Sequence, residues 1–489
     1  MKNKDEIFTD DELSIIKLLK EENLNPFPII SESYDSLFEI KESFSDDAEP
    51  RNVKVAGRII TKREHGKASF VTIINNGTKL QIYLRINTIG EDSYKIFKKF
   101  ITVGDFISTS GLLFRTHTGE ITVEAKDIML LSKSLSPLPE KWHGIENPEV
   151  RYRHRYLDLI INNESFNVFE TRSKIISAIR TTLGSMDFIE VETPTLQEVY
   201  GGALAKPFTT HHNALDEDLF LRIAPELYLK RLIIGGFNKV FEIGKAFRNE
   251  GISTQHNPEF TIMELYQAYA DYKDMMSITE KIFFDLTDKV IKKDSVEYKG
   301  EIISFKLPFK RLTLREAFDI YANVEIDKLK DLDYAKSYLS KERIPIDKNF
   351  NWANIIDEIL KKKVEPNLIQ PTFLYDYPLA LSPLAKKKPD DQEWVERFQP
   401  IIAGLEVGNA FTELNDPIDQ YERFFSQELA RKGGDQEAHS FDKEYIDAMK
   451  YGLPPTGGLG LGIDRIIMIL TGRESIREVI LFPQLRRKE

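Results

Sequence analysis

Residues 241–272, FEIGKAFRNEGISTQHNPEFTIMELYQAYADY, decide how the rest of this chain is organised. Apolar and polar residues alternate at 240–247 and 259–266 on either side of a polar loop, which predicts an antiparallel strand pair with a long connection. Side chains on a strand alternate between its two faces. One face of the second strand therefore carries two aromatic rings, an aliphatic side chain and a carboxylate: Phe260, Ile262, Glu264 and Tyr266.

The loop of this hairpin carries groups suited to an anionic ligand that contains a base. Arg248 offers a planar guanidinium that can pair with a phosphate or a carboxylate. Phe260 offers a flat ring for a base. The structural alternative is an ordinary hairpin with a charged loop. We favour a ligand pocket because a core strand has no use for a carboxylate and a phenol on one face.

This stretch resembles motif 2 of the class II aminoacyl-tRNA synthetases, which consists of a strand, an FRxE loop and a second strand. Residues 247–250 supply FRNE. Residues 256–261, HNPEFT, and 263–266, MELY, are similar to the lysine-specific branch of that class. The resemblance implies a ligase that activates L-lysine with ATP to lysyl-adenylate and then transfers lysine to the 3′ end of tRNA(Lys).

A helix followed by a strand and a proline resembles motif 1 of the same class. The motif spans about residues 164–194, with a helix predicted over 165–186 and FIEVETP at 188–194. The helix is predicted from four apolar residues at helical spacing: Phe169, Ile176, Ile179 and Leu183. In the family this motif packs against its twin in a second subunit, so the resemblance implies a homodimer.

Near the C-terminus, GLPPTGGLGLGIDRIIMIL reads as a glycine-lined strand that enters a helix with Arg465 in its first turn. Its glycine spacing does not fit a dinucleotide-binding fingerprint. Residues 457–470 instead resemble motif 3. With motif 2 at about 240–272, the segment at 274–363 is expected to be helical and is lysine-rich. It resembles the insertion that the family places between motifs 2 and 3.

Composition limits the class of protein. The chain has 489 residues and 41% hydrophobic content, enough for two or three domains with real cores. It has no cysteine, so a metal must be held by oxygen or imidazole. No apolar run is long enough to cross a bilayer, and the acidic start does not resemble a signal or transit peptide. We therefore expect a cytoplasmic protein with no membrane association.

A basic module lies within this acidic chain, whose net charge is -11. Residues 51–135 carry 14 basic and 7 acidic side chains, which suggests a local anionic partner. Five short alternating strands with a helix between the third and fourth predict an OB-fold, a barrel that binds single-stranded nucleic acid. The module resembles the family's anticodon-binding domain. The resemblance assigns anticodon contacts to Phe70, Gln81, Arg63 and Glu120.

Together these patterns predict an α+β multidomain chain. An N-terminal OB-fold β-barrel precedes a class II catalytic domain built on an antiparallel sheet flanked by helices. The expected domains are a helical, acidic lead-in at 1–50, the anticodon-binding domain at 51–135, a hinge at 136–163 and the catalytic domain at 164–489. Within the lead-in, a helix is predicted from about Asp10 to Glu22.

The resemblance also assigns the catalytic residues. Arg248 and Arg465 are the expected catalytic residues, and Glu406 is the expected ligand for the Mg²⁺ that accompanies ATP. ATP is expected to contact Arg248, Glu250, His256, Asn257, Phe260, Glu406 and Arg465. Lysine is expected to contact Gly202, Glu226, Arg248, Glu264, Tyr266, Asn409, Phe411 and Glu413.

Residues 397–413 raise two questions that the sequence leaves open: how Glu406 reaches the pocket, and whether residue 399 binds metal. Asn409, Phe411 and Glu413 share one strand face, whereas Glu406 has the opposite parity, so a bulge near Gly408 is required to bring all four into one pocket. The family commonly has a second metal-binding Glu where this chain has Gln399. An amide oxygen can coordinate a metal but carries no charge, which puts the second ligand in doubt.

Three alternative functions have distinguishing features. An aspartyl or asparaginyl synthetase should present a cation to the substrate side chain, whereas this chain offers Glu413 and Glu264. A protein-modifying lysyl ligase would lack the anticodon module at 51–135. A non-catalytic tRNA-binding paralogue should have lost Arg248 or Arg465, and both are present.

Overall fold

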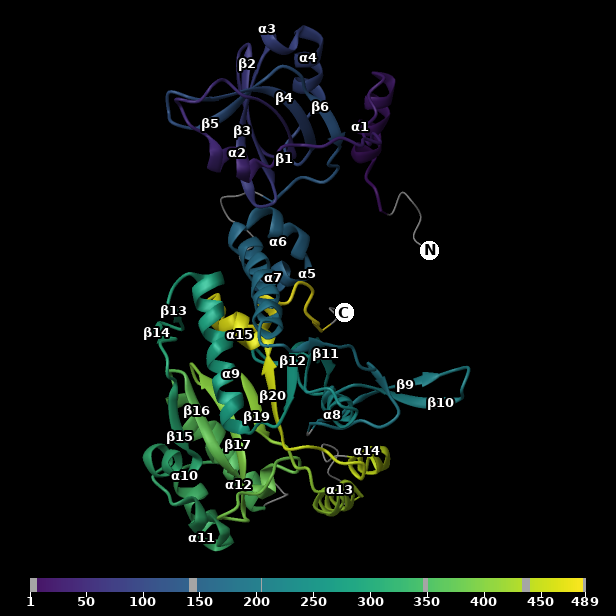
Figure 1. The fold of residues 1–489 in the computed structure, drawn as a ribbon. Coiled ribbons are helices and arrows are strands. Elements are labelled where there is room, and N and C mark those ends of the chain that lie inside the picture. Colours follow the sequence, from purple (N-terminus) through teal and green to yellow (C-terminus); the bar gives the residue numbers. More distant parts are fainter. Residues whose placement is uncertain (1–6, 140–146, 204, 346–350, 433–439, 487–489) are drawn as a thin grey trace. The chain divides into compact units, whose positions relative to one another are not determined.

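The computed structural model describes residues 7–139, 147–203, 205–345, 351–432 and 440–486. The chain divides into two compact units at the peptide bond between Asn167 and Val168 (Figure 1). Parts of the predicted lead-in (1–6), hinge (140–146), insertion (346–350) and C-terminal tail (487–489) lie outside the described residues. No helix in the described ranges is long and apolar enough to cross a membrane.

The N-terminal unit contains the predicted OB-fold. Its sheet has the order β1-β2-β3-β5-β4-β6, and an antiparallel pairing of β1 with β4 closes the barrel. The strands are β1 Asn52–His65, β2 Ala68–Asn75, β3 Thr78–Arg85, β4 Phe106–Arg115, β5 Ile121–Ala125 and β6 Met129–Ser132. The helices are α1 Asp10–Glu21, α2 Leu37–Ser43, α3 Ile86–Ile89, α4 Glu91–Phe100, α5 Pro148–Arg153 and α6 Arg155–Ile161.

The fifth predicted strand is two strands, β5 and β6. Asp127 interrupts it, because its carboxylate accepts hydrogen bonds from the Ser110 backbone amide and hydroxyl. The helix predicted from residue 10 is confirmed as α1. Thr9 and Glu12 form its capping box, each side chain accepting a hydrogen bond from the backbone amide of the other residue.

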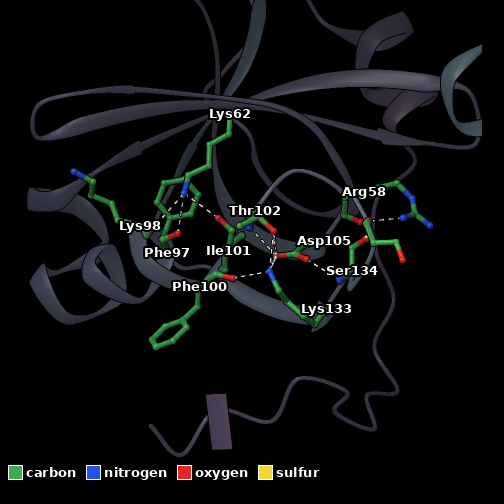
Figure 2. Close-up of polar contacts among 12 residues, drawn as sticks. Arg58, Lys62, Phe97, Lys98, Phe100, Ile101, Thr102, Asp105, Lys133 and Ser134 are labelled. Carbon is green, nitrogen blue, oxygen red and sulfur yellow. Dashed lines mark hydrogen bonds and ion pairs between the residues drawn. The ribbon is translucent and has the colours of Figure 1, made fainter. Parts of the chain in front are cut away.

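A buried ion pair fixes the end of α4 against β4 in the barrel (Figure 2). The Lys133 ammonium donates to the Phe100 carbonyl, the Thr102 hydroxyl and the Asp105 carboxylate, each over 2.8 Å. Lys62 caps α4 by donating to its last carbonyls, including that of Phe97 at 3.1 Å. Because Lys133 and Asp105 are both fully partnered, we assign this network a structural role.

The C-terminal unit is built on a mixed sheet with the order β15-β16-β17-β19-β20-β12-β11-β7, and β18 pairs with β17. Its interior is antiparallel, as predicted, but the two outermost pairs, β15 with β16 and β11 with β7, are parallel. The sheet strands are β7 Ile189–Glu190, β11 Lys239–Phe247, β12 Glu259–Ala268, β15 Lys310–Thr313, β16 Thr372–Pro378, β17 Trp394–Ile402, β18 Leu405–Glu406, β19 Gly408–Thr412 and β20 Thr456–Gly462.

Smaller strands and helices surround this sheet. The remaining strands are β8 Leu196–Gln197, β9 Phe208–His212, β10 Glu217–Leu221, β13 Ser295–Tyr298 and β14 Glu301–Ser304. The helices are α7 Asn163–Gly184, α8 Glu226–Ile234, α9 Tyr272–Asp285, α10 Leu314–Ala317, α11 Leu332–Lys341, α12 Trp352–Ile359, α13 Pro417–Lys432, α14 Lys443–Met449, α15 Ile463–Leu470 and α16 Ile476–Val479.

The strand period separates a core face from a site face on β12. Met263 and Leu265 are fully buried in the core that also contains residues of α9 and α15. Phe260, Glu264 and Tyr266 have the opposite parity and line a cavity on the other face. The predicted hairpin is confirmed, because β11 and β12 pair antiparallel from Lys239 with Gln267 to Phe247 with Glu259.

Two sequence predictions need correction in this unit. The motif 1 helix is present as α7, and the predicted Ile179 and Leu183 are fully buried. In the first half of the helix, Val168 and Ile175 are buried instead of the predicted Phe169 and Ile176, which are only partly buried. The segment 274–363 was expected to be helical, yet it also contains β13, β14 and β15. β15 was missed because it is a four-residue edge strand that pairs only with β16.

Candidate active site

The floor of the cavity is a row of glycines. β20 lies between β19 and β12, and Gly458 and Gly460 stand opposite Tyr266 and Glu264 of β12. A Cβ atom on Gly458 would lie 2.6 Å from a ring carbon of Tyr266 and in collision with a carboxylate oxygen of Glu413. The absence of side chains at Gly458 and Gly460 is therefore what opens space between the carboxylates.

One cavity of about 570 Å³ brings together the predicted catalytic-domain residues. Its lining includes Gly202, Glu226, Arg248, Glu250, His256, Asn257, Phe260, Glu264, Tyr266, Gln399, Glu406, Asn409, Phe411, Glu413 and Arg465. These residues come from segments more than 250 positions apart in the sequence. The cavity is thus a single pocket assembled by the sheet.

The predicted bulge lies between Glu406 and Ala410. Glu406 pairs with Ile401 of β17, and Ala410 pairs with Phe398, so β17 advances by three residues while the other strand advances by four. The extra residue shifts the alternation of faces by one. Glu406 therefore lines the same cavity as Asn409 and Glu413.

Arg248 is poised for an anion. It lines the cavity beside Phe260, with its guanidinium carbon 5.1 Å from the centre of that ring. Its buried Nε has no hydrogen-bond partner among the described residues. Burial lowers its pKa, although Glu250, Glu406 and Glu264 oppose this, and an arginine remains charged. A buried guanidinium with an unused donor is a site for a carboxylate or phosphate.

Arg465 reaches the same end of the cavity from α15. It donates to the backbone carbonyl of Glu406 over 2.6 Å, and its other terminal nitrogen lies 3.1 Å from Nε2 of His256. Burial and the nearby Arg465, Lys361 and Arg248 lower the pKa of His256, so its ring is neutral at pH 7. Because arginine can only donate, Nε2 is the acceptor and the ring proton lies on Nδ1, next to the Ser253 hydroxyl.

Asp464 fixes the direction in which Arg465 points. Its carboxylate accepts hydrogen bonds from the Arg172 guanidinium and, over 2.7 Å, from the Thr261 backbone amide. These bonds join the first turn of α15 to α7 and β12. The arginine that follows Asp464 is thereby held against the cavity.

The opposite end of the cavity is acidic. Glu264 is 5% exposed and accepts a 3.1 Å hydrogen bond from the Tyr266 hydroxyl. Burial, assisted by Glu226, raises the pKa of Glu264 to about 8. Glu264 is therefore largely protonated at neutral pH in the free protein and would ionise when a cation binds beside it.

A lysine that we had not predicted lies behind these acids. The Lys230 ammonium is 2.5 Å from Oε1 of Glu226 and also forms an ion pair with Glu413. Lys230 is completely buried and is not part of the cavity wall. Its only sequence signal is its position four residues after Glu226 on α8, a spacing typical of ordinary surface pairs.

Glu226 and Glu413 are held in place on the cavity wall. Gly202, with φ of +86°, lies directly against Glu226, and a Cβ on that glycine would be 2.8 Å from the Cβ of Glu226. Burial raises the pKa of both carboxylates, and the attraction of Lys230 opposes that rise. Glu413 Oε2 pairs with the Lys230 ammonium, whereas Oε1 has no partner in the described part of the chain. Glu413 thus keeps an unused acceptor for an incoming cation.

Of the two predicted metal-ligand positions, only Glu406 offers a carboxylate. Glu406 lines the cavity and its side chain is 35% exposed. The side-chain oxygen of Gln399 already accepts a 2.5 Å hydrogen bond from Tyr377. The described residues contain no cluster of three acidic, histidine or cysteine side chains that could hold a metal alone. This arrangement suits Mg²⁺ held by one carboxylate and the oxygens of a phosphorylated ligand.

Other cavity residues escaped the sequence analysis. Arg397 donates to the side chain of Asn409 over 2.8 Å and so orients that predicted residue. Asp357 of α12 and Lys361, which follows that helix, pair over 2.6 Å and also line the cavity. They belong to the segment expected to be an insertion, and no motif marks them.

The OB-fold carries an outward face of aromatic and polar side chains. Phe70 of β2 and Tyr83 of β3 pair across the strands and stack with ring centres 4.6 Å apart. Tyr83 was not predicted, although it lies two residues after Gln81 on the same face. The Gln81 side-chain oxygen accepts a hydrogen bond from Thr122, so its amide nitrogen is the group left for a base edge.

The two less central OB-fold candidates lie around this face. Arg63 was expected on the turn between strands, but it belongs to β1 and pairs with Phe70 in the register. Glu120 lies just before β5 and forms a 3.7 Å ion pair with Lys41. Arg63 therefore lies beside the stacked pair of Phe70 and Tyr83, whereas Glu120 lies at the start of β5.

Both units are similar to known protein families. Residues 147–486 match the family described as tRNA synthetases class II (D, K and N), and residues 53–131 match the OB-fold nucleic acid binding domain. The lysine-tRNA ligase of Pelotomaculum thermopropionicum is 51% identical over 445 residues, 91% of this chain and 88% of that protein. The lysine-tRNA ligase of Moorella thermoacetica is 49% identical over 471 residues, 96% of each chain. That of Clostridium tetani is 48% identical over 472 residues, 96% of this chain and 94% of that protein.

Proposed function

The chain belongs to the tRNA synthetases class II (D, K and N), and from this premise we propose that its cavity is the site where lysine is joined to AMP before transfer to tRNA. The named relatives support lysine-tRNA ligation as the activity of this chain. It is an aminoacyl-tRNA synthetase that depends on ATP.

One observation carries the assignment of the site. A single cavity has two guanidinium groups, Arg248 and Arg465, at one end and three buried carboxylates at the other. The carboxylates are Glu226, Glu264 and Glu413. A nucleotide with its phosphates suits the first end, and the two ammonium groups of lysine suit the second.

The reaction brings two negative groups together. The lysine carboxylate attacks the α-phosphorus of ATP, the bond to pyrophosphate breaks, and lysyl-adenylate forms. The site must therefore supply positive charge and alignment more than acid or base. Arg248 bridges the lysine carboxylate and the α-phosphate in our assignment, and its unused Nε supports this role.

The adenine end and the metal follow from the same geometry. We assign the base to the Phe260 ring and Arg465, with Glu250, His256 and Asn257 around its edge or the phosphates. Glu406 would hold Mg²⁺, which when bound neutralises the charge of the phosphates.

At the acidic end of the cavity, we assign each of the two ammonium groups of lysine to one carboxylate. Glu226 with the Gly202 backbone receives the α-ammonium group, and Glu413 with Tyr266 receives the ε-ammonium group, supported by Glu264. Asn409 and Phe411 complete the wall. An aspartyl or asparaginyl specificity is not favoured, because the cation nearest these acids, Lys230, lies behind them rather than in the cavity wall.

ATP–pyrophosphate exchange with each of the twenty amino acids tests the function. We expect the highest kcat/KM with lysine. A maximum at another amino acid would refute the substrate assignment, and no exchange with any of them would favour a non-catalytic tRNA-binding role.

The outward aromatic face of the OB-fold leads to a prediction about tRNA. Phe70→Ala should weaken tRNA(Lys) binding about 5- to 150-fold, since one stacked base contributes about 1–3 kcal/mol. ATP–pyrophosphate exchange, which needs no tRNA, should not change. Phe106→Ala is the matched control, because Phe106 is an exposed barrel aromatic that packs on Arg58 instead. Equal tRNA affinity of the two variants would remove Phe70 from the anticodon site.

Gln399 leads to a prediction about magnesium. Gln399→Glu adds a carboxylate beside Glu406 and should lower the Mg²⁺ concentration for half-maximal exchange about 10-fold. Direct Mn²⁺ binding followed by paramagnetic resonance should tighten in parallel. Gln392→Glu, an exposed change of the same charge outside the cavity, should leave both unchanged. Identical titrations for the wild type and Gln399→Glu would exclude any role for position 399 in metal binding.

We also propose that the chain acts as a cytoplasmic homodimer. Ile189 of β7 and Leu196 of β8, in and just after the motif 1 stretch, are about half exposed, which supports a partner surface there. Sedimentation of the purified chain should give twice the mass of one copy.

A further inference from the structure

Lys230 has an unusual position for a lysine. It lies one helical turn after Glu226 on α8, is 0% exposed, and has its ammonium within 2.5 Å of Oε1 of Glu226. The same ammonium forms an ion pair with Glu413, which lies more than 180 residues later in the chain. It therefore bridges the two carboxylates that we assign to the two ammonium groups of the substrate.

The charges of the buried groups balance only when Lys230 is counted. Glu226, Glu264 and Glu413 carry three negative charges when ionised, and Lys230 leaves two of them uncompensated. Lysine brings two ammonium groups to this end, while its carboxylate faces Arg248. Without Lys230 the three acids would exceed the incoming charge by one, and a buried carboxylate in excess takes up a proton.

The groups around Lys230 come from four elements. Glu226 is on the same helix, Glu264 and Tyr266 are on β12, Glu413 follows β19, and Tyr445 is on α14. Arg248 is the other cation that acts on Glu264. Lys230 is also 5.4 Å from the centre of the Phe411 ring and 5.8 Å from that of Tyr266.

We propose that Lys230 is a positioning residue for the amino-acid substrate: its buried ammonium bridges Glu226 and Glu413 and keeps both carboxylates ionised and in place for the two ammonium groups of lysine. The proposal rests on the roles assigned above to these acids. Lys230 acts through them, because it does not line the cavity.

Lys230→Met tests the proposal through the pH dependence of KM. An opposite charge lowers a carboxylate pKa by about 1–3 units, so removing Lys230 should raise the pKa of Glu226 and Glu413 and leave one of them protonated at pH 7. We expect KM for lysine to rise about 30-fold at pH 7. The ratio of this KM to that of the wild type should fall as the pH rises from 6.5 to 8.5, because the carboxylate with the raised pKa then ionises. KM for ATP should not change.

Two further variants separate positioning from general damage to the fold. Lys230→Arg retains the charge, so its KM for lysine should exceed that of the wild type by a factor that does not vary with pH. Lys133→Met removes another buried, ion-paired lysine, in the barrel, and should leave KM for lysine unchanged. A pH-independent increase in Lys230→Met, or none at all, would overturn the proposal. Lack of lysine-dependent exchange by the wild type would instead refute the function itself.

Calorimetry of the wild type decides the matter even if Lys230→Met is insoluble. Lysine binding is measured at pH 7 in buffers of different ionisation enthalpy, which gives the number of protons released. If Lys230 keeps Glu226 and Glu413 ionised, only Glu264, with its pKa of about 8, can lose a proton. We expect release of at most one proton. Release of two would show that a bridged carboxylate is protonated before lysine binds and would overturn the proposal.

Discussion

Arg248→Ala should lower kcat for lysine-dependent ATP–pyrophosphate exchange about 10³-fold, equivalent to about 4 kcal/mol of transition-state stabilisation. The reason is that charge develops on the α-phosphate as the lysine carboxylate approaches, and Arg248 is the buried guanidinium with an unused donor beside the position that we propose for this phosphate. Single-turnover formation of lysyl-adenylate measures the step directly.

Arg248→Lys should recover only part of this loss, because an ammonium keeps the charge but cannot bridge two groups with a planar fork. Arg311→Ala is the control, since Arg311 is half exposed on β15 outside the cavity lining. An Arg248→Ala variant with normal kcat and a raised KM for ATP alone would show that Arg248 binds the nucleotide without stabilising the transition state.

Glu413→Gln should raise KM for lysine about 10³-fold while KM for ATP stays unchanged. Glu413 is 1% exposed, and removing one partner of a buried ion pair costs about 3–5 kcal/mol. The KM for norleucine, a neutral analogue that lacks the ε-ammonium group, should rise far less. The preference of the enzyme for lysine over norleucine should therefore be largely lost.

Glu422→Gln is the matched control for charge, because Glu422 is exposed on α13 and does not line the cavity. If Glu413→Gln keeps its preference for lysine over norleucine, the ε-ammonium group is recognised by another residue. Glu264 would then be the next candidate, because it lies on the same wall and its hydrogen bond with Tyr266 leaves it further acceptor sites.

Simple strand alternation predicted which residues of β12 line the cavity. The period of two on β12 put Phe260, Glu264 and Tyr266 on one face, and the pairing with β20 and the cavity lining agree with this. Parity also required a bulge between Glu406 and Asn409, and the register contains one extra residue there. These features depend on local geometry, which a short stretch of sequence determines.

Features that depend on contacts distant in sequence could not be predicted in this way. Lys230 and Glu226 are spaced like a solvent-exposed helical pair, and only the arrival of Glu413 from a remote strand makes Lys230 a buried bridge. The stack of Phe70 on Tyr83 likewise depends on the register between two strands. On α7, the helical period correctly identified Ile179 and Leu183 as buried, but the rotation of the first half of the helix depends on what it packs against, so Val168 and Ile175 are buried there instead of Phe169 and Ile176.

The glycine row of β20 limits how the amino-acid specificity of this enzyme can change. Glycine is already the smallest residue, so no substitution on this side of β20 can enlarge the cavity. A larger residue at Gly458 would collide with Glu413 and Tyr266. Variants that accept bulkier lysine derivatives must therefore gain space from the neighbouring strand β19, where the side chains of Phe411 and Asn409 can be replaced by smaller ones.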